Sequence, residues 1–380
     1  MRSALAIVTT LVVGLLLAGP ASGGTPARSG DPVPVLAHYY IWFNPTSWNR
    51  AKIDYPLLGR YSSDDAAVML RHVRLAKQAG IDGFLVSWKS TPLLNRRLAQ
   101  LAKIAREENF KLGIVYQGLD FFRNPLPAER IRHDLRYFAN TYGRDRAFSL
   151  FGRPVVAWSG TWNFSRREIA SVTKPVQDRL LVLAMERSVE SYADLADLVA
   201  GNAYYWSSVN PETYPDHGDK LAEMGRAVHR RGGLWIAPAA PGFDARLVGG
   251  NSVVPRLDGK TFRRELDAAF ASSPDAVGVI SWNEFSENTH IEPSRRYGLT
   301  SLNVLADVLG SHVTLDDDYA FDSSEASSTV GYATPFVVGC GVLLLAGIGA
   351  VFWRRQLRSN ARGTTANDTG IKDEEKVGLT

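Results

Sequence analysis

The sequence contains almost no cysteine. Among its 380 residues there is one, Cys340. The chain before Cys340 therefore cannot be held together by a disulfide framework, which needs cysteine pairs. Its stability must come from a hydrophobic core, and a composition of 45% hydrophobic and 22% charged residues at this length is typical of a globular protein.

The sequence also lacks an excess of one charge and lacks metal-binding motifs. Residues 25–331 contain nearly equal numbers of basic and acidic side chains, which argues against a nucleic-acid partner. The seven histidines show no HExxH or related spacing, and the G-x-S-x-G motif of serine hydrolases is absent. We therefore expect no nucleic acid, no metal and no other cofactor.

Long uncharged apolar runs are found only near the two ends of the chain. At the start, Arg2 precedes an apolar run over residues 4–18 and a group of small residues. This is the layout of a secretory signal peptide, which we place at residues 1–24; an uncleaved signal anchor is the alternative.

The second apolar run covers residues 332–353 and carries no charge. Its length suits a transmembrane helix through a lipid bilayer, and the arginines that follow favour a cytoplasmic tail at residues 354–380. An acidic, serine-rich segment at residues 311–331 reads as a stalk. The sequence thus predicts a single-pass protein of the cell membrane, with its main domain, residues 25–310, outside the cell.

Within this main domain, apolar strand-like runs alternate with stretches of helical periodicity. Eight such units favour an α/β fold of the closed (β/α)8 barrel type, with an open doubly wound sheet as the alternative. The strand candidates are 33–42, 81–88, 110–117, 153–159, 179–186, 197–206, 233–240 and 276–284. The helix candidates are 63–80, 92–108, 128–142, 190–196, 212–231 and 261–272.

Aromatic and polar residues gather at the ends of these strand candidates, which is where a barrel places its active site. Such a ring suits a sugar, because aromatic faces stack on the C–H faces of pyranose rings; packing in the core is the alternative for each aromatic taken singly. The predicted substrate-binding residues are Tyr39, Tyr40, Trp42, Trp88, Tyr116, Gln117, Tyr204, Tyr205, Asp244, Trp282 and Asn283.

Two carboxylates follow the last strand candidate, in the stretch "SWNEFSENTHIEPS". Glu284 ends the strand and Glu287 lies in the loop after it, so both can reach one cleft. Glycoside cleavage by a retaining enzyme uses two carboxyl groups that lie close together, one of which protonates the leaving oxygen. Repulsion between two close carboxylates separates their pKa values, so one stays protonated while the other ionises.

This stretch resembles the end of glycoside hydrolase family 99, the endo-α-1,2-mannosidases and mannanases, whose motif reads approximately WNEWHEGTxIEP. Weaker matches lie earlier in the chain, in the family's order, among them "HYYIWF", "LLGRYSSDD" and "GRPVVAW". The resemblance implies a (β/α)8 barrel that cleaves α-linked mannose within a chain, with retention and without a metal. By position, it implies that Glu284 assists the substrate's 2-hydroxyl in forming a 1,2-anhydro sugar, and that Glu287 is the acid and then the base.

Four positions depart from the family pattern. Asn288 replaces a glycine, Ser286 replaces a histidine, Lys89 replaces a tryptophan, and Gln117 stands where the family carries a glutamate that contacts the sugar. Both predicted catalytic glutamates are retained, so the departures bear on the identity of the sugar more than on the reaction. We therefore expect a retaining endo-acting glycoside hydrolase on an α-mannan-like glycan; a catalytically silent carbohydrate-binding barrel is the alternative.

Overall fold

The computed structural model describes residues 32–50, 52–120, 122–316 and 319. The predicted signal peptide, the apolar run 332–353 and the tail 354–380 lie outside these residues. Among the helices of the described part, none is long and apolar enough to cross a membrane. Val313 and Tyr319, which fall in the segment predicted as a stalk, are buried in the main hydrophobic core.

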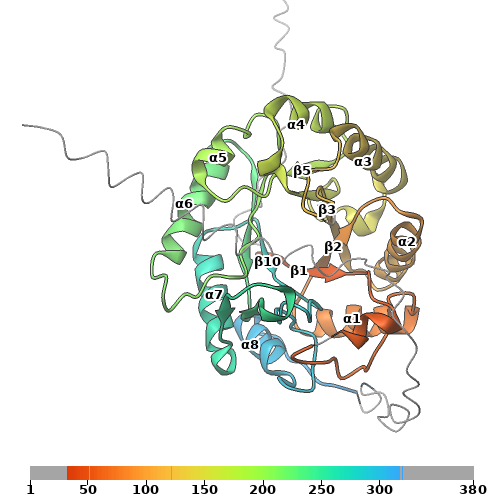
Figure 1. The fold of residues 1–380 in the computed structure, drawn as a ribbon, viewed down its shortest axis with the longest axis vertical. Helices are drawn as coiled ribbons and strands as arrows, with labels where there is room; N and C mark the ends of the chain where they lie inside the picture. Colours follow the sequence, from red (N-terminus) through yellow and green to blue (C-terminus); the bar gives the residue numbers. More distant parts are fainter. Residues whose placement is uncertain (1–31, 51, 121, 317–318, 320–380) are drawn as a thin grey trace, which may run out of the picture.

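Eight parallel strands form the centre of the molecule, in the order β5-β4-β3-β2-β1-β10-β7-β6. A parallel bridge between Ala184 and Asn202 joins the two outer strands, so the sheet curves round into a barrel. The helices surround it, as Figure 1 shows along the barrel axis. The strands are β1 (Val35–Tyr40), β2 (Gly83–Trp88), β3 (Lys111–Gln117), β4 (Val155–Ser159), β5 (Leu181–Leu183), β6 (Gly201–Ala203), β7 (Leu234–Ala239) and β10 (Ala276–Val279).

The predicted (β/α)8 architecture and all eight predicted strands are confirmed, and the open doubly wound sheet is excluded. A short antiparallel hairpin, β8 (Phe243–Asp244) with β9 (Val253–Val254), was not predicted. The helices are α1 (Ala66–Gln78), α2 (Pro92–Glu107), α3 (Ala128–Tyr142), α4 (Arg166–Thr173), α5 (Val189–Ala193), α6 (His217–His229), α7 (Lys260–Ala271) and α8 (Thr300–Leu309). Short 3-10 helices are η1 (Pro45–Asn49), η2 (Arg146–Phe148), η3 (Thr161–Asn163), η4 (Arg246–Val248) and η5 (Leu257–Gly259).

Two of these helices, α4 and α8, were not predicted. The signal for α4 was present, because Ser165 and Glu168 form a reciprocal capping box at its start. In α8, apolar residues such as Leu302 and Leu305 are fully buried against the barrel.

The core has two layers, which follow from the alternation of side chains along each strand. One face of every strand points into the barrel, where Leu36, Leu85 and Val115 belong to a small interior cluster. The other face packs against the helices, in a much larger cluster that includes Phe84 and Ile114. The interior layer is what supports the floor of any site at the barrel mouth.

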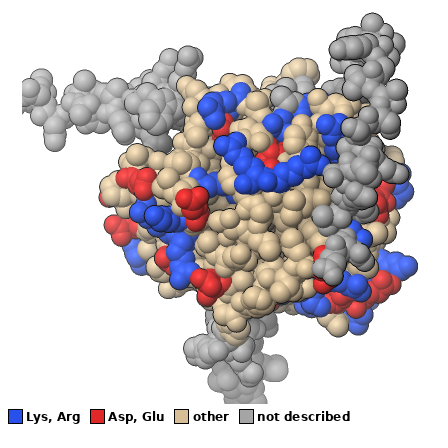
Figure 2. Space-filling view, turned by 90° about the horizontal axis from the view of Figure 1, so that it is seen from below, with Lys and Arg blue, Asp and Glu red and all other residues tan. Residues whose placement is uncertain are grey.

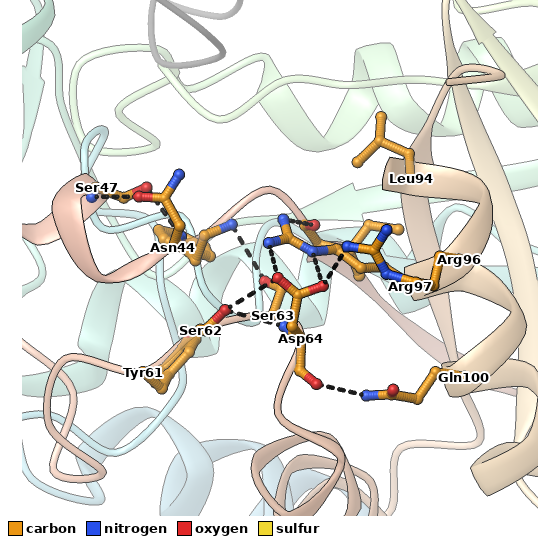
Figure 3. A network of polar contacts seen from close by, with 12 residues as sticks. Asn44, Ser47, Tyr61, Ser62, Ser63, Asp64, Leu94, Arg96, Arg97 and Gln100 are labelled. Atoms are coloured by element: carbon orange, nitrogen blue, oxygen red, sulfur yellow. Dashed lines mark hydrogen bonds and ion pairs between the residues drawn. The ribbon is translucent and has the colours of Figure 1, made fainter. Parts of the chain in front are cut away.

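A polar network fixes the long loop between β1 and α1 to α2 (Figure 3). The buried Arg97 donates to both carboxylate oxygens of Asp64 and, through a third nitrogen, to the carbonyl oxygen of Ile41 at 2.9 Å. Arg97, together with Arg96, thereby lowers the pKa of Asp64 to about 2. The network anchors the backbone next to Trp42 at the mouth of the barrel.

Candidate active site

The loop after β10 is unusual because every residue from 280 to 294 is buried. A buried loop must satisfy its own backbone polar groups. Here the chain folds back on itself: the Ser281 N–H donates to the Thr289 carbonyl at 2.8 Å, and the Ile291 N–H donates to the Ser281 carbonyl at 2.9 Å. Such a loop can hold two carboxylates in fixed positions without strand or helix geometry.

Two buried hydrogen-bond networks tie this loop to the rest of the barrel. Glu292 accepts a hydrogen bond from the Tyr61 hydroxyl at 2.8 Å, and its other oxygen lies 3.0 Å from His72 Nε2 on α1. Two residues earlier in the loop, His290 Nε2 lies 3.1 Å from the Asp54 carboxylate. The loop is thus clamped at residues 290 and 292, just beyond the two predicted catalytic glutamates.

Glu284 and Glu287 are both buried and interact electrostatically. Burial raises the pKa of Glu284 to about 7, while the Ser286 N–H, donating to Oε1 at 2.9 Å, opposes that rise. Burial and the neighbouring Glu284 charge raise the pKa of Glu287 well above its ordinary value. Near neutral pH the pair can therefore hold one ionised and one protonated carboxyl group, which is the division of roles that acid/base catalysis needs.

Two cations near the glutamates were not found from the sequence. Lys52, in the loop after β1, lowers the pKa of Glu284, and Arg123, in the loop after β3, lowers that of Glu287. Both lie far from residue 287 along the chain, in loops with no periodic pattern. Only the closure of the barrel brings them to the last strand.

A narrow cavity lies at the carboxyl ends of the strands. Tyr40 and Tyr205 line it, and their hydroxyl oxygens are 3.0 Å apart. Burial raises the pKa of both tyrosines, and the charges of Glu284 and Glu287 raise it further, so the two glutamates lie close to this wall of the cavity. Gln117 lies in the same wall and donates to the Ser87 hydroxyl at 2.9 Å.

Half-buried aromatic side chains lie on several of the loops that follow the strands. Trp42 packs on Tyr40 with ring centroids 4.4 Å apart, and Tyr204 packs on Trp206 at 5.2 Å. Trp162, which was not among the predicted residues, also lines the cavity. The Arg187 guanidinium lies 4.0 Å from the centre of its ring. Partly exposed aromatic faces of this kind are suited to stack on sugar rings.

Four of the predicted substrate-binding residues face the wrong way. The hydroxyl of Tyr39 lies 3.0 Å from His72 on α1, Trp88 donates to Asn95 on α2, and Tyr116 donates to Asp134 on α3. Trp282 also packs outward, with its ring centroid 5.5 Å from that of Phe84. The prediction that these four side chains line the cleft is wrong. Tyr39, Trp88 and Tyr116 lie in strands, where adjacent residues point to opposite faces and their neighbours occupy the inner face. Trp282 lies beyond the end of β10, in the buried loop, and packs in the helix-side core.

Asn283 has a positioning role in place of the predicted contact with substrate. It is fully buried, and its side-chain amide accepts from the Tyr40 N–H at 2.8 Å and donates to the Tyr40 carbonyl at 3.0 Å. The amide therefore fixes Tyr40 of β1 next to the loop that carries Glu284.

The remaining predicted residue, Asp244, lies on the hairpin beside the loop after β10. Its N–H donates to the Glu287 carbonyl at 2.8 Å, and its carboxylate is bound by Arg246. Asp244 lines a second cavity beside this loop, and it does not line the narrow cavity of Tyr40 and Tyr205.

The structure also accounts for two departures from the family motif. Asn288 has a φ of 54°, a left-handed conformation that asparagine tolerates better than most residues, so it can replace a glycine. Ser286 binds Glu284 through its backbone N–H, which any residue would supply, and a hydrogen bond from its side chain also lowers the pKa of Glu284. Within the part of the chain that the structure describes, no group of three or more His, Cys, Asp or Glu side chains could hold a metal ion.

Comparison with known proteins agrees with this geometry. Residues 44–306 match the family model described as glycosyl hydrolase family 99. The chain belongs to this family. Its fold resembles that of the family 99 endo-alpha-mannosidase from Bacteroides thetaiotaomicron, with a TM-score of 0.64 at 19% identity over 73% of this chain and 96% of that one.

Mammalian proteins are among the curated relatives of this family 99 chain. It is 20% identical over 268 residues to the mouse glycoprotein endo-alpha-1,2-mannosidase-like protein, and 21% identical over 269 residues to the rat glycoprotein endo-alpha-1,2-mannosidase. These matches cover 63% of this chain, and 57% and 56% of the mouse and rat proteins respectively. The chain thus spans little more than half of their length.

Proposed function

We propose that this protein is an endo-acting glycoside hydrolase that cleaves α-mannosidic or related α-glycosidic bonds with retention of configuration. The observation that carries the proposal is the buried, electrostatically coupled pair Glu284 and Glu287 at the mouth of a family 99 barrel. The activities named for the mouse, rat and Bacteroides relatives support the choice of α-mannose as substrate.

In the proposed first step, the Glu284 carboxylate removes the proton from the sugar's 2-hydroxyl. The 2-oxygen attacks the anomeric carbon, the bond from that carbon to the leaving oxygen breaks, and Glu287 donates its proton to the leaving oxygen. A 1,2-anhydro sugar results. The raised pKa of Glu287 supports its role as the acid, since it is protonated before the step.

In the second step, the Glu287 carboxylate removes a proton from water as the water attacks the anomeric carbon. The three-membered ring opens, and the 2-oxygen recovers its proton from Glu284. Two successive inversions at the anomeric carbon give net retention. Tyr40, Trp42, Tyr204, Tyr205 and Gln117 are the side chains that we propose contact the sugar.

The test is incubation of the purified full chain with α-1,2-, α-1,3- and α-1,6-linked mannan and glucan oligosaccharides, with products followed by NMR. Internal cleavage that first releases the α-anomer is expected, and it would identify the linkage. Initial release of the β-anomer would refute retention. Binding of an oligosaccharide without product over long incubation would favour the carbohydrate-binding alternative.

We further propose that the protein is anchored in the cell membrane through residues 332–353 with the barrel outside. The uncharged sequence of this segment and the arginines after it support the anchor. The test is fractionation of cells that express the full chain, followed by protease treatment of intact cells. Recovery of the barrel in the soluble fraction would refute the anchor.

A further inference from the structure

A second cavity lies beside the loop that carries Glu287. It has a volume of about 370 Å³, within the range of roughly 300–1,000 Å³ that is usual for small-molecule sites. Its walls come from the β8–β9 hairpin, η5 and the segment that leads into α8. Three arginines line it: Arg246, Arg256 and Arg296.

These arginines differ in how their charges are compensated. Arg246 binds the carboxylate of Asp244. Arg256 is buried and donates to neutral acceptors, the carbonyl oxygens of Asn288 and His290 and the Ser301 hydroxyl. No carboxylate lies within ion-pair distance of Arg256 or Arg296 among the residues that the structure describes. At longer range, the charge of Asp54 acts on Arg256 and that of Arg296 acts on Asp244. Asp258, which also lines the cavity, is exposed.

Two buried polar atoms at this cavity lack a hydrogen-bond partner within the described part of the chain. One is Nε of Arg256, a side chain that is 8% exposed, and the other is Oδ1 of Asn288, which is 6% exposed. A buried donor or acceptor without a partner is unfavourable by about 1–3 kcal/mol. A ligand with an anionic oxygen for Arg256 and a hydroxyl for Asn288 would satisfy both atoms.

Basic side chains also gather on the face of the molecule that is seen from the side of α8 (Figure 2). The segment that carries Arg296 leads into α8, which lies at the lower edge of Figure 1. Figure 2 views the molecule from that side and shows Lys and Arg side chains gathered in a band across the upper part of the face. A local positive potential attracts anions to this side of the barrel.

The cavity is connected directly to the catalytic loop. Asn288 follows Glu287 in the chain, and the Asp244 N–H donates to the Glu287 carbonyl oxygen. Arg256 holds the carbonyl oxygens of Asn288 and His290. A group bound in this cavity would therefore lie against the backbone of the loop that carries the proposed acid.

We propose that this arginine cavity is a binding site for an oxyanion of the phosphate type, carried by a sugar unit of the glycan next to the bond that is cleaved. The guanidinium groups of Arg256 and Arg296 bind the anionic oxygens, and Asn288 Oδ1 accepts a hydrogen bond from a sugar hydroxyl. That the oxyanion belongs to the glycan rests on the proposed function. That the cavity binds an oxyanion does not.

The test measures binding by isothermal titration calorimetry with the full chain and three probes: inorganic phosphate, mannose 6-phosphate and mannose. None of these contains a glycosidic bond, so the result does not depend on turnover and is separate from the test of hydrolysis. The variant is Arg296→Gln, because Arg296 is exposed and its replacement leaves the core intact. Arg136→Gln on α3, also exposed, is the control with the same change in charge.

Mannose 6-phosphate is expected to bind more tightly than phosphate or mannose, and Arg296→Gln is expected to weaken it about tenfold or more, the usual effect of losing a charge-assisted contact. Arg296→Lys, which keeps the charge, should lose less. Equal binding of phosphate and mannose 6-phosphate, with the same loss in Arg296→Gln, would support the oxyanion site but assign it to free phosphate. Equal binding of mannose and mannose 6-phosphate, or equal effects of Arg296→Gln and Arg136→Gln, would overturn the proposal.

Discussion

Two loops at the mouth of the barrel contribute to the site in opposite ways. The loop after β10 is buried throughout residues 280–294, and it carries both glutamates. The loop after β3, residues 118–126, contains Phe122, which is 80% exposed, together with Arg123, whose charge acts on Glu287. The proposed chemistry is therefore placed on a buried loop, while a partly exposed loop supplies charge and surface around it.

The largest effect should come from the carboxylates of the buried loop. Glu287→Gln is expected to reduce kcat on oligosaccharides by about 10³-fold or more, because the leaving oxygen loses its proton donor. Binding of the oligosaccharide should change little. The control is Glu265→Gln, another buried glutamate with a raised pKa, which lies on α7 outside the proposed site. Equal activity of both variants would remove Glu287 from the mechanism.

The fixed loop should also contribute far more to stability than the exposed one. Glu292→Ala is expected to lower the free energy of unfolding by about 3 kcal/mol, since it leaves Tyr61 and His72 without their buried partner. Phe122→Ala should change it by less than about 0.5 kcal/mol, as expected at an exposed position. Urea unfolding of the two variants gives the comparison, and similar losses would show that the two loops do not differ.

Aromatic residues on the two faces of the sheet should differ in whether their replacement affects substrate binding or stability. Trp42→Ala is expected to raise KM about tenfold with a smaller change in kcat, because a half-buried ring at the mouth loses its contact with sugar. Trp88→Phe should lower the melting temperature and leave KM unchanged, since Trp88 packs on α2 and α3. A raised KM in Trp88→Phe would contradict its placement outside the cleft.

The smallest effect concerns the pH profile. The proposed mechanism needs Glu284 ionised, so activity should fall as the pH falls through about 7, and it should fall again at high pH when Glu287 loses its proton. Lys52 lowers the pKa of Glu284, so Lys52→Met should raise that pKa. The acidic limb of the kcat profile should then move to higher pH, and kcat at pH 6 should fall by less than about tenfold. The exposed Lys103→Met is the control, and an unmoved limb would exclude Lys52 from the site.

The same raised pKa has a consequence for stability. Because the folded pKa of Glu284 lies above its ordinary value of 4.5, the folded state binds the proton more tightly than the unfolded state does. This group therefore stabilises the fold relatively more at low pH, and that contribution is lost as the pH rises from 4.5 to about 7. In Glu284→Gln, this part of the pH dependence should disappear from the urea unfolding curves.

The sequence by itself determined the strands and the two glutamates. Eight apolar runs alternating with helical periods are a local property, and the stretch around Glu284 and Glu287 is continuous in the chain. The alternation rule could also have separated Tyr40 from Tyr39 and Gln117 from Tyr116, because it requires only knowledge of one inward-facing residue per strand. The capping box of α4 was readable in the same way.

Only the tertiary structure decided which distant residues join the glutamates. Lys52, Arg123 and Trp162 lie in loops without periodicity, and the barrel's closure brings them to the end of β10. The arginine cavity likewise combines a hairpin, a 3-10 helix and the start of α8. The physical reason is that a pKa, an ion pair or a cavity depends on distances through space and on burial, and neither is set by neighbours in the chain.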